Sequence, residues 1–352
     1  MSNSAYQFDG DDGFVFEQYN DQPAFASFLP GIAGATGRPA WVFYVNRGQA
    51  IASFGVRNKD DAMLEFYPAD KAYQLTASRG FRTFLKISDG HSRVTHEPFQ
   101  RGAGAHVRQR LHIRPHEVSV EEAHPGLGLT VCAHSYTLAD APLAALVRRV
   151  TLRNTGSTPK TIDIVDGLPQ VLPYGMNQWC AKYMSRTAEA LMVVDGMAQN
   201  SPFYRLKVLP GDSPLVVPVL GGNFFAGFVD QGRTQTLVDA QKIFGLALDF
   251  SIPEKFYADE ALELDHQVAG NRTPSAFQAL TLQLLPGESR TFYGLYGQAP
   301  SWQALQDFLG GIAGSGYFEA KRGANRQLIR DLTQRAFTAT AYPLFDAYAR
   351  QS

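Results

Sequence analysis

The sequence predicts a mainly β protein built on a large antiparallel sandwich, with a helical segment at its C-terminal end. In the clearest run, Val150 and Leu152 alternate with Arg149, Thr151 and Arg153, and this period of two is typical of half-buried strands. Short runs of this kind follow one another with Gly, Pro, Asn or Asp between them, without the helical patterns of a βαβ fold. Helical spacing begins only near residue 300.

Several strand pairs are predicted in order along the chain. The run WVFYVNRGQAIASFGV forms two β-rich segments around a turn at Arg47 and Gly48, which is a hairpin signal. The strand around Val150 ends at NTGSTP, after which Ile162 and Ile164 alternate with polar neighbours in a second strand. Further strands are predicted in GFRTFLKISDG, GLGLTVCAHSYTL, FQALTLQLL and SRTFYGLYG.

A first helix is predicted in SWQALQDFLGG. Ser301 is a suitable N-cap, and Gly310 and Gly311 form a stop signal. Between them, apolar residues fall at helical spacing: Trp302, Leu305, Phe308 and Leu309.

Two more helices are expected after it. One runs from about Phe318, with Leu328, Ile329 and Leu332 on its apolar stripe. After Pro343, the residues Leu344, Phe345 and Tyr348 begin another stripe, which has no capping residue before Ser352. We therefore expect a β domain over residues 1–300 and a helical linker over residues 301–352.

The amino-acid composition indicates which classes of binding partner are expected. Hydrophobic residues make up 45% of the 352 residues and charged residues 18%, which is typical of a globular protein. The net charge is -1 and basic residues form no run, so neither nucleic acid nor a membrane surface is an expected partner. Two cysteines, Cys132 and Cys180, are too few for a disulfide framework and indicate a reducing compartment. With no secretory signal in MSNSAYQFDGDDG, we expect a cytoplasmic protein.

Seven of the eight histidines lie between His91 and His134, which makes this region the candidate for a metal or proton-transfer site. The segment LHIRPHEVSVEEAHPG supplies the candidate ligands, but Pro115 rules out a helical pair between His112 and His116. We therefore expect polar faces of exposed strands, and no metal or other cofactor. The candidates are His112, His116, His124, Glu117, Glu121 and Glu122.

Two short motifs are interpreted as coincidences. Ser157 and Lys160 match the Ser-x-x-Lys pattern of some acyl-transfer enzymes, but that motif needs a helix, and these residues flank Pro159 in a predicted turn. The glycines between Gly310 and Gly316 follow a helix and lack the lysine of a phosphate-binding loop, so a linker is the better interpretation.

The segment DGLPQVLPYGMNQWCAKY is the strongest candidate binding surface. Its Gly and Pro residues predict a constrained loop, and aromatic faces stack on sugar rings while amides and carboxylates bind hydroxyl groups. Ordinary packed loops share this composition, so the pattern alone leaves both interpretations open. The candidate sugar-binding residues are Asp166, Gln170, Tyr174, Asn177, Gln178 and Trp179.

Four stretches resemble the N-terminal region of the 1,2-β-oligoglucan phosphorylases, which belong to the cellobiose phosphorylase family, glycoside hydrolase family 94. They are FEQYNDQPAFASFLPGIAG, the long segment from Trp41 to Ile87, DGLPQVLPYG, and the terminal FDAYARQS. The resemblance extends from about Phe14 to Ser352, and the segment from Trp41 to Ile87 is its most specific part.

The resemblance implies four parts: an N-terminal β supersandwich of the galactose mutarotase-like class, a helical linker, a catalytic α/α barrel and a small C-terminal β domain. It implies that this chain supplies the first two and stops where the barrel begins. Phosphorolysis with inversion uses a carboxylic acid and inorganic phosphate as co-substrate, and the family's general acid is a barrel aspartate. We therefore assign no catalytic residue, and we expect the chain alone to be inactive.

The partners implied by the resemblance are a β-glucan oligosaccharide, an α/α barrel in the same chain or on a second polypeptide, and a second copy in a homodimer. Two alternatives stay open. One is a stand-alone carbohydrate-binding module. The other is a mutarotase-like sugar epimerase, in which His and Glu would move a proton between the ring oxygen and the anomeric hydroxyl.

Overall fold

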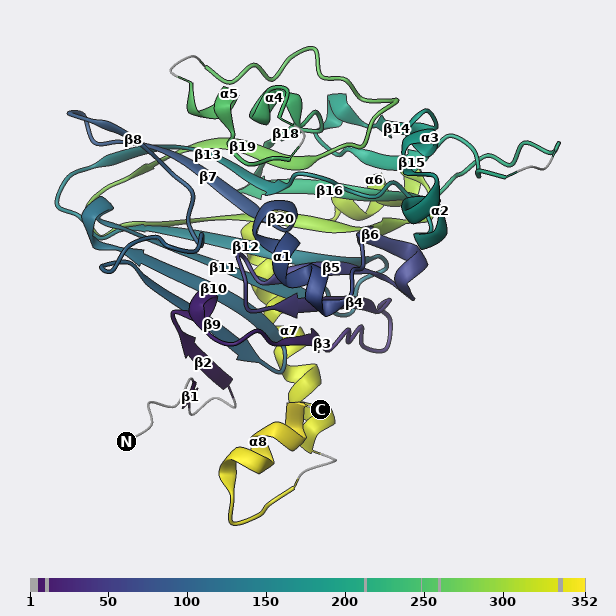
Figure 1. Cartoon of the computed structure of the whole chain (residues 1–352). Helices are drawn as coiled ribbons and strands as arrows, with labels where there is room; N and C mark the ends of the chain where they lie inside the picture. The colour runs from purple at the N-terminus through teal and green to yellow at the C-terminus, as the bar shows by residue number, and fades with distance from the viewer. Residues whose placement is uncertain are drawn as a thin grey trace.

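Three antiparallel β-sheets form the body of the protein in the computed structural model (Figure 1). The structure describes residues 6–9, 13–211, 214–247, 249–258, 261–334 and 338–351. Residues 1–5 and 10–12 near the N-terminus, and Ser352, therefore lie outside the described residues. Within the described part, no helix is both long enough and apolar enough to cross a bilayer.

The large sheet contains eleven strands. The order of its strands in space differs from their order in the sequence. Strands β9 to β12 and β20 lie at the centre of the sheet. In spatial order the strands are β1 (Gln7–Asp9), β2 (Gly13–Glu17), β9 (Arg108–Arg114), β10 (Glu117–His124), β11 (Leu129–Thr137), β12 (Ala144–Asn154), β20 (Ser289–Ala299), β16 (Gly222–Val229), β15 (Phe203–Leu206) and β14 (Met192–Asp195), with β17 (Gly232–Arg233) paired to β16.

Two smaller sheets form the opposite layer. The five-stranded sheet has the order β18 (Gln235–Leu237), β19 (Ala276–Leu284), β13 (Lys160–Leu168), β7 (Arg82–Ser88) and β8 (Arg93–His96). The four-stranded sheet has the order β3 (Ala26–Leu29), β4 (Ala40–Val45), β5 (Ile51–Val56) and β6 (Ala62–Leu64).

The main core lies between the two layers. Val150 and Leu152 of β12 and Ile162 and Ile164 of β13 all belong to it, as their alternation predicts. Residues of the four-stranded sheet such as Phe54 join the same core. The predicted mainly β, antiparallel sandwich is therefore confirmed.

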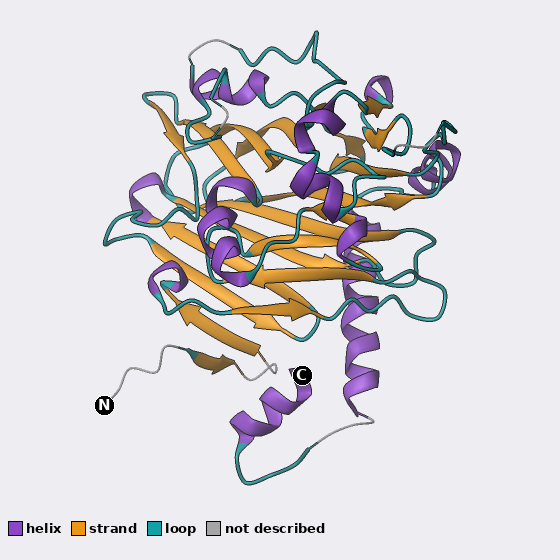
Figure 2. Cartoon of the chain, turned by 45° about the vertical axis from the view of Figure 1, so that its right-hand side comes forward, coloured by secondary structure: helices purple, strands orange, loops and turns teal. Residues whose placement is uncertain are grey.

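Helices cover the outer faces of the sheets (Figure 2). Helices α6 (Trp302–Gly310) and α7 (Ser315–Gln334) pack on the large sheet, where Val147 faces outward to meet them. Helices α4 (Gln241–Phe244) and α5 (Glu254–Tyr257) pack on the five-stranded sheet, and α1 (Ala69–Arg79) on the four-stranded one. Three further helices are α2 (Gln178–Tyr183), α3 (Ser185–Glu189) and α8 (Pro343–Gln351).

The start of α6 agrees with the sequence, since the Ser301 Oγ accepts a hydrogen bond from the Ala304 backbone N–H at 3.2 Å. The predicted stripe of α7 is only partly right. Ile329 is buried, but Leu332 is 47% exposed, and α7 instead presents Phe318 and Asn325 to the sheet. The sequence pattern missed this face because one of its residues is polar. Leu344, Phe345 and Tyr348 of α8 are also exposed.

A buried ion pair joins the two layers of the sandwich. Arg148 of β12 and Asp166 of β13 have fully buried side chains, and the Arg148 Nη2 lies 2.7 Å from the Asp166 Oδ1. The Thr83 hydroxyl of β7 donates to the same Asp166 oxygen at 2.7 Å, and Arg148 also donates to the Gln49 side-chain oxygen. The Arg148 guanidinium stacks 4.7 Å from the Phe81 ring centroid. These partners offset the cost of removing both charges from water.

Replacing Asp166 with Ala should lower the free energy of unfolding by about 3–5 kcal/mol, because Arg148 would keep its buried charge without a counter-ion. Urea unfolding followed by circular dichroism measures the change. Asp163→Ala on the same strand is the control, since Asp163 is 42% exposed and 3.6 Å from Arg93, and it should lose less than about 1 kcal/mol. Equal losses in the two variants would contradict the role given to the buried pair.

Candidate functional site

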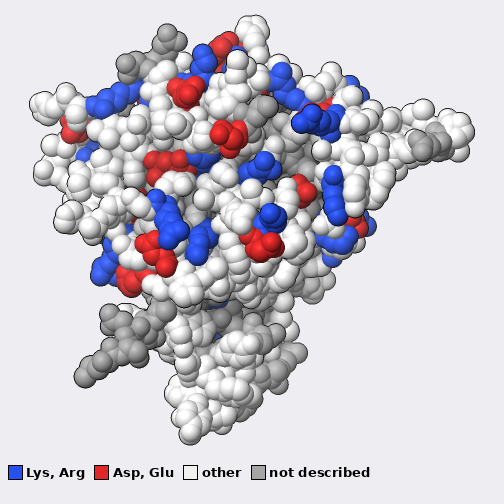
Figure 3. All heavy atoms as spheres, viewed as in Figure 1, with Lys and Arg blue, Asp and Glu red and all other residues white. Residues whose placement is uncertain are grey.

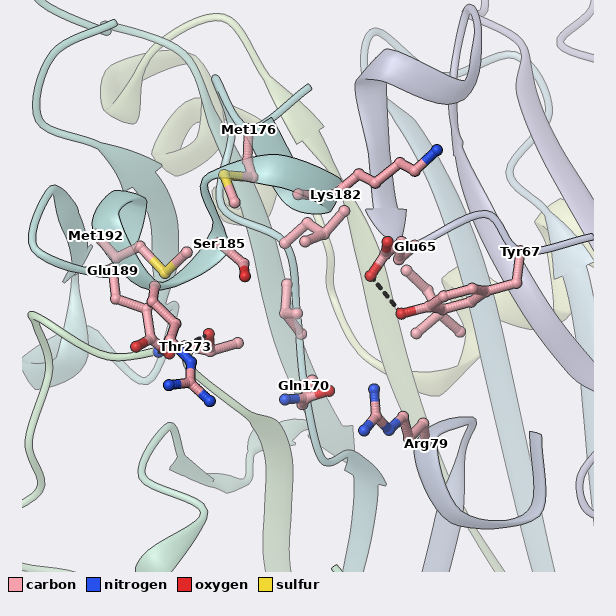
Figure 4. A pocket seen from close by; sticks show the side chains of 15 residues that line it. Glu65, Tyr67, Arg79, Gln170, Met176, Lys182, Ser185, Glu189, Met192 and Thr273 are labelled. Atoms are coloured by element: carbon pink, nitrogen blue, oxygen red, sulfur yellow. Dashed lines mark hydrogen bonds between the residues drawn. The ribbon is translucent and has the colours of Figure 1, made fainter. Parts of the chain in front are cut away.

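A cleft of about 580 Å³ lies between the β6–α1 region and the short helices α2 and α3 (Figure 4). Its volume falls in the range of small-molecule sites, about 300–1,000 Å³. The lining is mixed, with apolar residues such as Met176 and Met192 beside polar and charged ones. The polar and charged residues of the lining are Glu65, Tyr67, Arg79, Gln170, Lys182, Ser185, Arg186, Glu189 and Thr273.

One wall comes from the connection between β6 and α1. Strand β6 ends at Leu64, and the hydroxyl of Tyr67 donates a 2.6 Å hydrogen bond to Glu65 Oε2. Burial, together with this hydrogen bond, raises the pKa of Tyr67 to about 12, while Arg79 acts in the opposite direction. The phenol therefore stays protonated at neutral pH and holds the Glu65 carboxylate in place.

The other wall begins with the loop that follows β13. Backbone hydrogen bonds hold this loop: Val171 N–H donates to Pro274 at 2.9 Å, and Leu172 N–H donates to Met63 at 2.9 Å. Tyr174 N–H donates to Tyr204 at 3.0 Å. Gln170 precedes these anchored residues and lines the cleft. Its amide can both donate and accept hydrogen bonds, as recognition of a hydroxyl group requires.

Helices α2 and α3 complete this wall. The Asn177 side chain caps α2 by accepting a hydrogen bond from Cys180 N–H at 2.8 Å. The backbone N–H of Gln178 donates to Asp60 at 3.1 Å, which ties α2 to the loop before β6. At the end of α3, the Glu189 Oε1 accepts hydrogen bonds from both the backbone N–H and the hydroxyl of Thr273, at 3.2 and 2.8 Å.

The six candidate residues from the sequence do not form one surface. Gln170 lines the cleft, whereas Asn177 and Gln178 hold α2 in position. Tyr174 lies at a separate hollow of about 220 Å³ with Arg57. Asp166 is fully buried in the ion pair described above, and Trp179 is exposed on α2.

A sugar-facing role does not fit the placement of Asp166, because its carboxylate is enclosed between the sheets. Residues Asp166 to Leu168 also continue β13 instead of belonging to the predicted loop. Likewise, Gln178 and Trp179 are helical and not part of a loop. Of the glycines and prolines in the segment, Gly167 lies in β13, and Pro169, Pro173 and Gly175 lie between β13 and α2.

Trp179 and Tyr183 form an exposed aromatic pair on α2, next to the cleft. They are 57% and 63% exposed, and their ring centroids lie 6.0 Å apart. Residues four apart on a helix lie on the same face, which explains why they meet. Exposed aromatic rings of this kind can stack on the C–H faces of sugars.

The histidine-rich segment does not form the exposed strand faces that we expected. His116 and Glu117 are buried where β9 and β10 meet α7. Arg322 of α7 contacts Glu117 through two hydrogen bonds of 2.6 and 2.7 Å, and Asn325 donates to the His116 carbonyl at 3.1 Å. Burial lowers the pKa of His116 to about 4. The described residues include no group of three or more metal-ligating side chains.

A His–Glu pair does occur at His96 and Glu122, which lie 26 residues apart in the chain and share no motif. The His96 Nε2 lies 2.7 Å from Glu122 Oε1. The other carboxylate oxygen accepts hydrogen bonds from Phe99 N–H at 2.6 Å and from the Gln109 side chain at 2.8 Å. Both oxygens of this fully buried carboxylate are thus used within the protein, which does not favour the mutarotase-like alternative.

Sequence reasoning missed most of the polar residues in the cleft. Glu65, Tyr67 and Arg79 lie about a hundred residues before Gln170, and no motif links them. Glu65, Tyr67 and Arg79 do fall in the stretch from Trp41 to Ile87 that carries the resemblance, and Gln170 falls in DGLPQVLPYG. The cleft therefore lies where these two stretches meet.

Comparisons with known proteins give no family. No protein-family model matches the chain, and no curated protein matches it. Among solved structures, similar chains include a polysaccharide lyase (TM-score 0.43, 11% identity, 77% of this chain and 34% of that one) and a bacterial glucoamylase in complex with acarbose (0.38, 7%, 88% and 41%). A candidate kojibiose phosphorylase from the human microbiome is also similar (0.33, 7%, 90% and 31%).

These three solved proteins are carbohydrate-processing enzymes by name. The chain spans only 31–41% of the length of these solved chains. Because every TM-score is below 0.5 and identity is 7–11%, neither activity nor substrate is transferred from them to this protein.

Proposed function

We propose that the chain is the non-catalytic N-terminal part of an inverting glycoside phosphorylase acting on β-1,2-glucan oligosaccharides, and that its cleft contacts the glycan. The observation that carries the proposal is the position of the cleft. One wall comes from the stretch 41–87, and the other wall includes Gln170, Val171 and Leu172 of the stretch 166–175; both stretches resemble the 1,2-β-oligoglucan phosphorylases. Phosphorolysis to α-glucose 1-phosphate would be the work of an α/α barrel in the same chain or on a second polypeptide.

The chemistry of the cleft supports sugar contact. Gln170, Ser185 and Thr273 offer amide and hydroxyl groups, and Glu65 and Tyr67 form a fixed acceptor–donor pair. Sugar hydroxyls both donate and accept, so such a mixed lining suits them. The exposed pair Trp179 and Tyr183 on α2 adds a stacking surface beside the cleft.

Titration of the chain with a β-1,2-gluco-oligosaccharide tests the glycan contact. Gln170→Ala and Tyr67→Phe should each weaken binding about three- to tenfold, because each removes a hydrogen bond worth about 1 kcal/mol. Gln283→Ala and Tyr342→Phe are matched controls at exposed positions outside the cleft lining and should leave binding unchanged. If folded cleft variants bind as tightly as the wild type, the cleft is not the glycan site.

Phosphate release from α-glucose 1-phosphate, with sophorose as acceptor, tests the non-catalytic role. The chain alone should release none, and release should appear when a separately expressed barrel polypeptide is added. Release by this chain alone would place a catalytic acid within these 352 residues and would contradict the proposal.

A homodimer also belongs to this proposal. Apolar side chains are exposed on the described residues 207–211 and 214–221, which project between β15 and β16 in Figure 1 and are drawn mostly white in Figure 3. They are Leu209, Leu215, Val216, Val217 and Leu220. Apolar surface of this kind favours contact with another protein surface. Light scattering should therefore give the mass of two chains, and a monodisperse single chain at high concentration would contradict the dimer.

The exposed Trp179–Tyr183 pair favours one alternative, a stand-alone carbohydrate-binding module. The two functions predict different results when the chain is mixed with a separately expressed barrel polypeptide and phosphate release is measured. A stand-alone module binds the oligosaccharide but does not restore phosphorolysis to a barrel, whereas the proposed phosphorylase part does both.

A further inference from the structure

Three cationic side chains line the cleft, and they come from both of its walls. Arg79 is in the last turn of α1, Lys182 is in α2 and Arg186 is in α3. None of the three lies within 4.0 Å of a carboxylate oxygen among the described residues. The Lys182 ammonium instead lies 4.9 Å from the Tyr183 ring centroid.

The two carboxylates of the cleft already have neutral partners. Glu65 accepts a hydrogen bond from Tyr67, and Glu189 accepts two from Thr273. These bonds fix the carboxylates without bringing them to the arginines. The lining thus carries three positive and two negative charges, a net charge of +1, and none of the five groups forms an ion pair with a described residue.

Two other half-buried arginines, Arg47 and Arg233, also lack a carboxylate partner, but both donate to backbone carbonyls. Other half-buried or buried arginines form ion pairs. Arg82 is paired with Glu97 at 2.6 Å, Arg322 with Glu117 at 2.6 Å, and Arg148 with Asp166 at 2.7 Å. Arg79 is half-buried, and its guanidinium points into the cleft between Gln170 and the Tyr67 hydroxyl (Figure 4). Partial burial without a counter-ion costs free energy, which an anionic ligand would recover.

We infer that this cleft contains, beside the glycan contacts, a subsite for an anionic group, a phosphate or carboxylate on a sugar, and that the Arg79 guanidinium binds it with help from Arg186. The planar guanidinium matches both groups, since it can form two parallel hydrogen bonds to either one. Lys182 adds positive potential at the rim, which raises the local concentration of an anion. This inference rests on the proposed sugar-binding function and specifies the ligand class for the same cleft.

Isothermal titration with four probes tests the inference: α-glucose 1-phosphate, glucuronate, glucose and inorganic phosphate. At least one charged sugar should bind about ten- to a hundredfold more tightly than glucose, as expected for a charge-assisted hydrogen bond of about 1.5–3 kcal/mol. Preference for α-glucose 1-phosphate would identify phosphate as the group, and preference for glucuronate would identify carboxylate.

Arg79→Gln should abolish that preference, and Arg79→Lys should restore only part of it, because the charge returns without the planar fork. Arg153→Gln on β12 is the matched control, since Arg153 is exposed and does not line the cleft. Thermal melting of each variant verifies that it is folded.

Equal binding of glucose and the two charged sugars would overturn the inference, as would equal losses in Arg79→Gln and Arg153→Gln. Tight binding of inorganic phosphate that exceeds both charged sugars would also overturn it, because the ligand would then not be a sugar. The uncharged β-1,2-gluco-oligosaccharide titration is separate, so the anionic subsite can fail while Gln170-dependent glycan binding, and with it the proposed function, still holds.

Discussion

The buried ion pair between Arg148 and Asp166 determines how the rest of the structure is arranged. It joins β12 of the large sheet to β13 of the five-stranded sheet, and Thr83 and Gln49 extend the network to β7 and to the β4–β5 turn. Four separate parts of the chain thus meet at one pair of charges. Because leaving either charge buried without the other is costly, the pair favours the register in which the two layers pack here.

The same network positions the cleft. Helix α1 ends at Arg79, and β7, which carries Thr83, begins three residues later at Arg82. On the other side, β13 ends at Leu168, two residues after Asp166 and two before Gln170. Strands β7 and β13, which carry Thr83 and Asp166 of this network, therefore directly adjoin the two walls of the cleft. The core and the candidate site are parts of one arrangement, although only the site faces solvent.

Much of the fold could be predicted from the sequence, because alternation of period two is a local property. Asp166 shows where local reasoning failed: it continues the Ile162, Ile164 pattern and so lies on the core face, but the Gly and Pro beside it suggested a loop. The polar contact between Arg322 and Glu117 could not be predicted, since the partners lie far apart in the chain. The cleft was missed for the same reason, except for Gln170.

A crystal structure of the chain with a bound β-1,2-gluco-oligosaccharide tests the central claim most directly. The account predicts density for sugar rings between α1 and α2–α3, with hydroxyl groups in hydrogen-bond contact with Gln170 and with the Glu65–Tyr67 pair. Sugar bound only at the hollow beside Tyr174, or only on the outer face of Trp179 with the cleft empty, would contradict it.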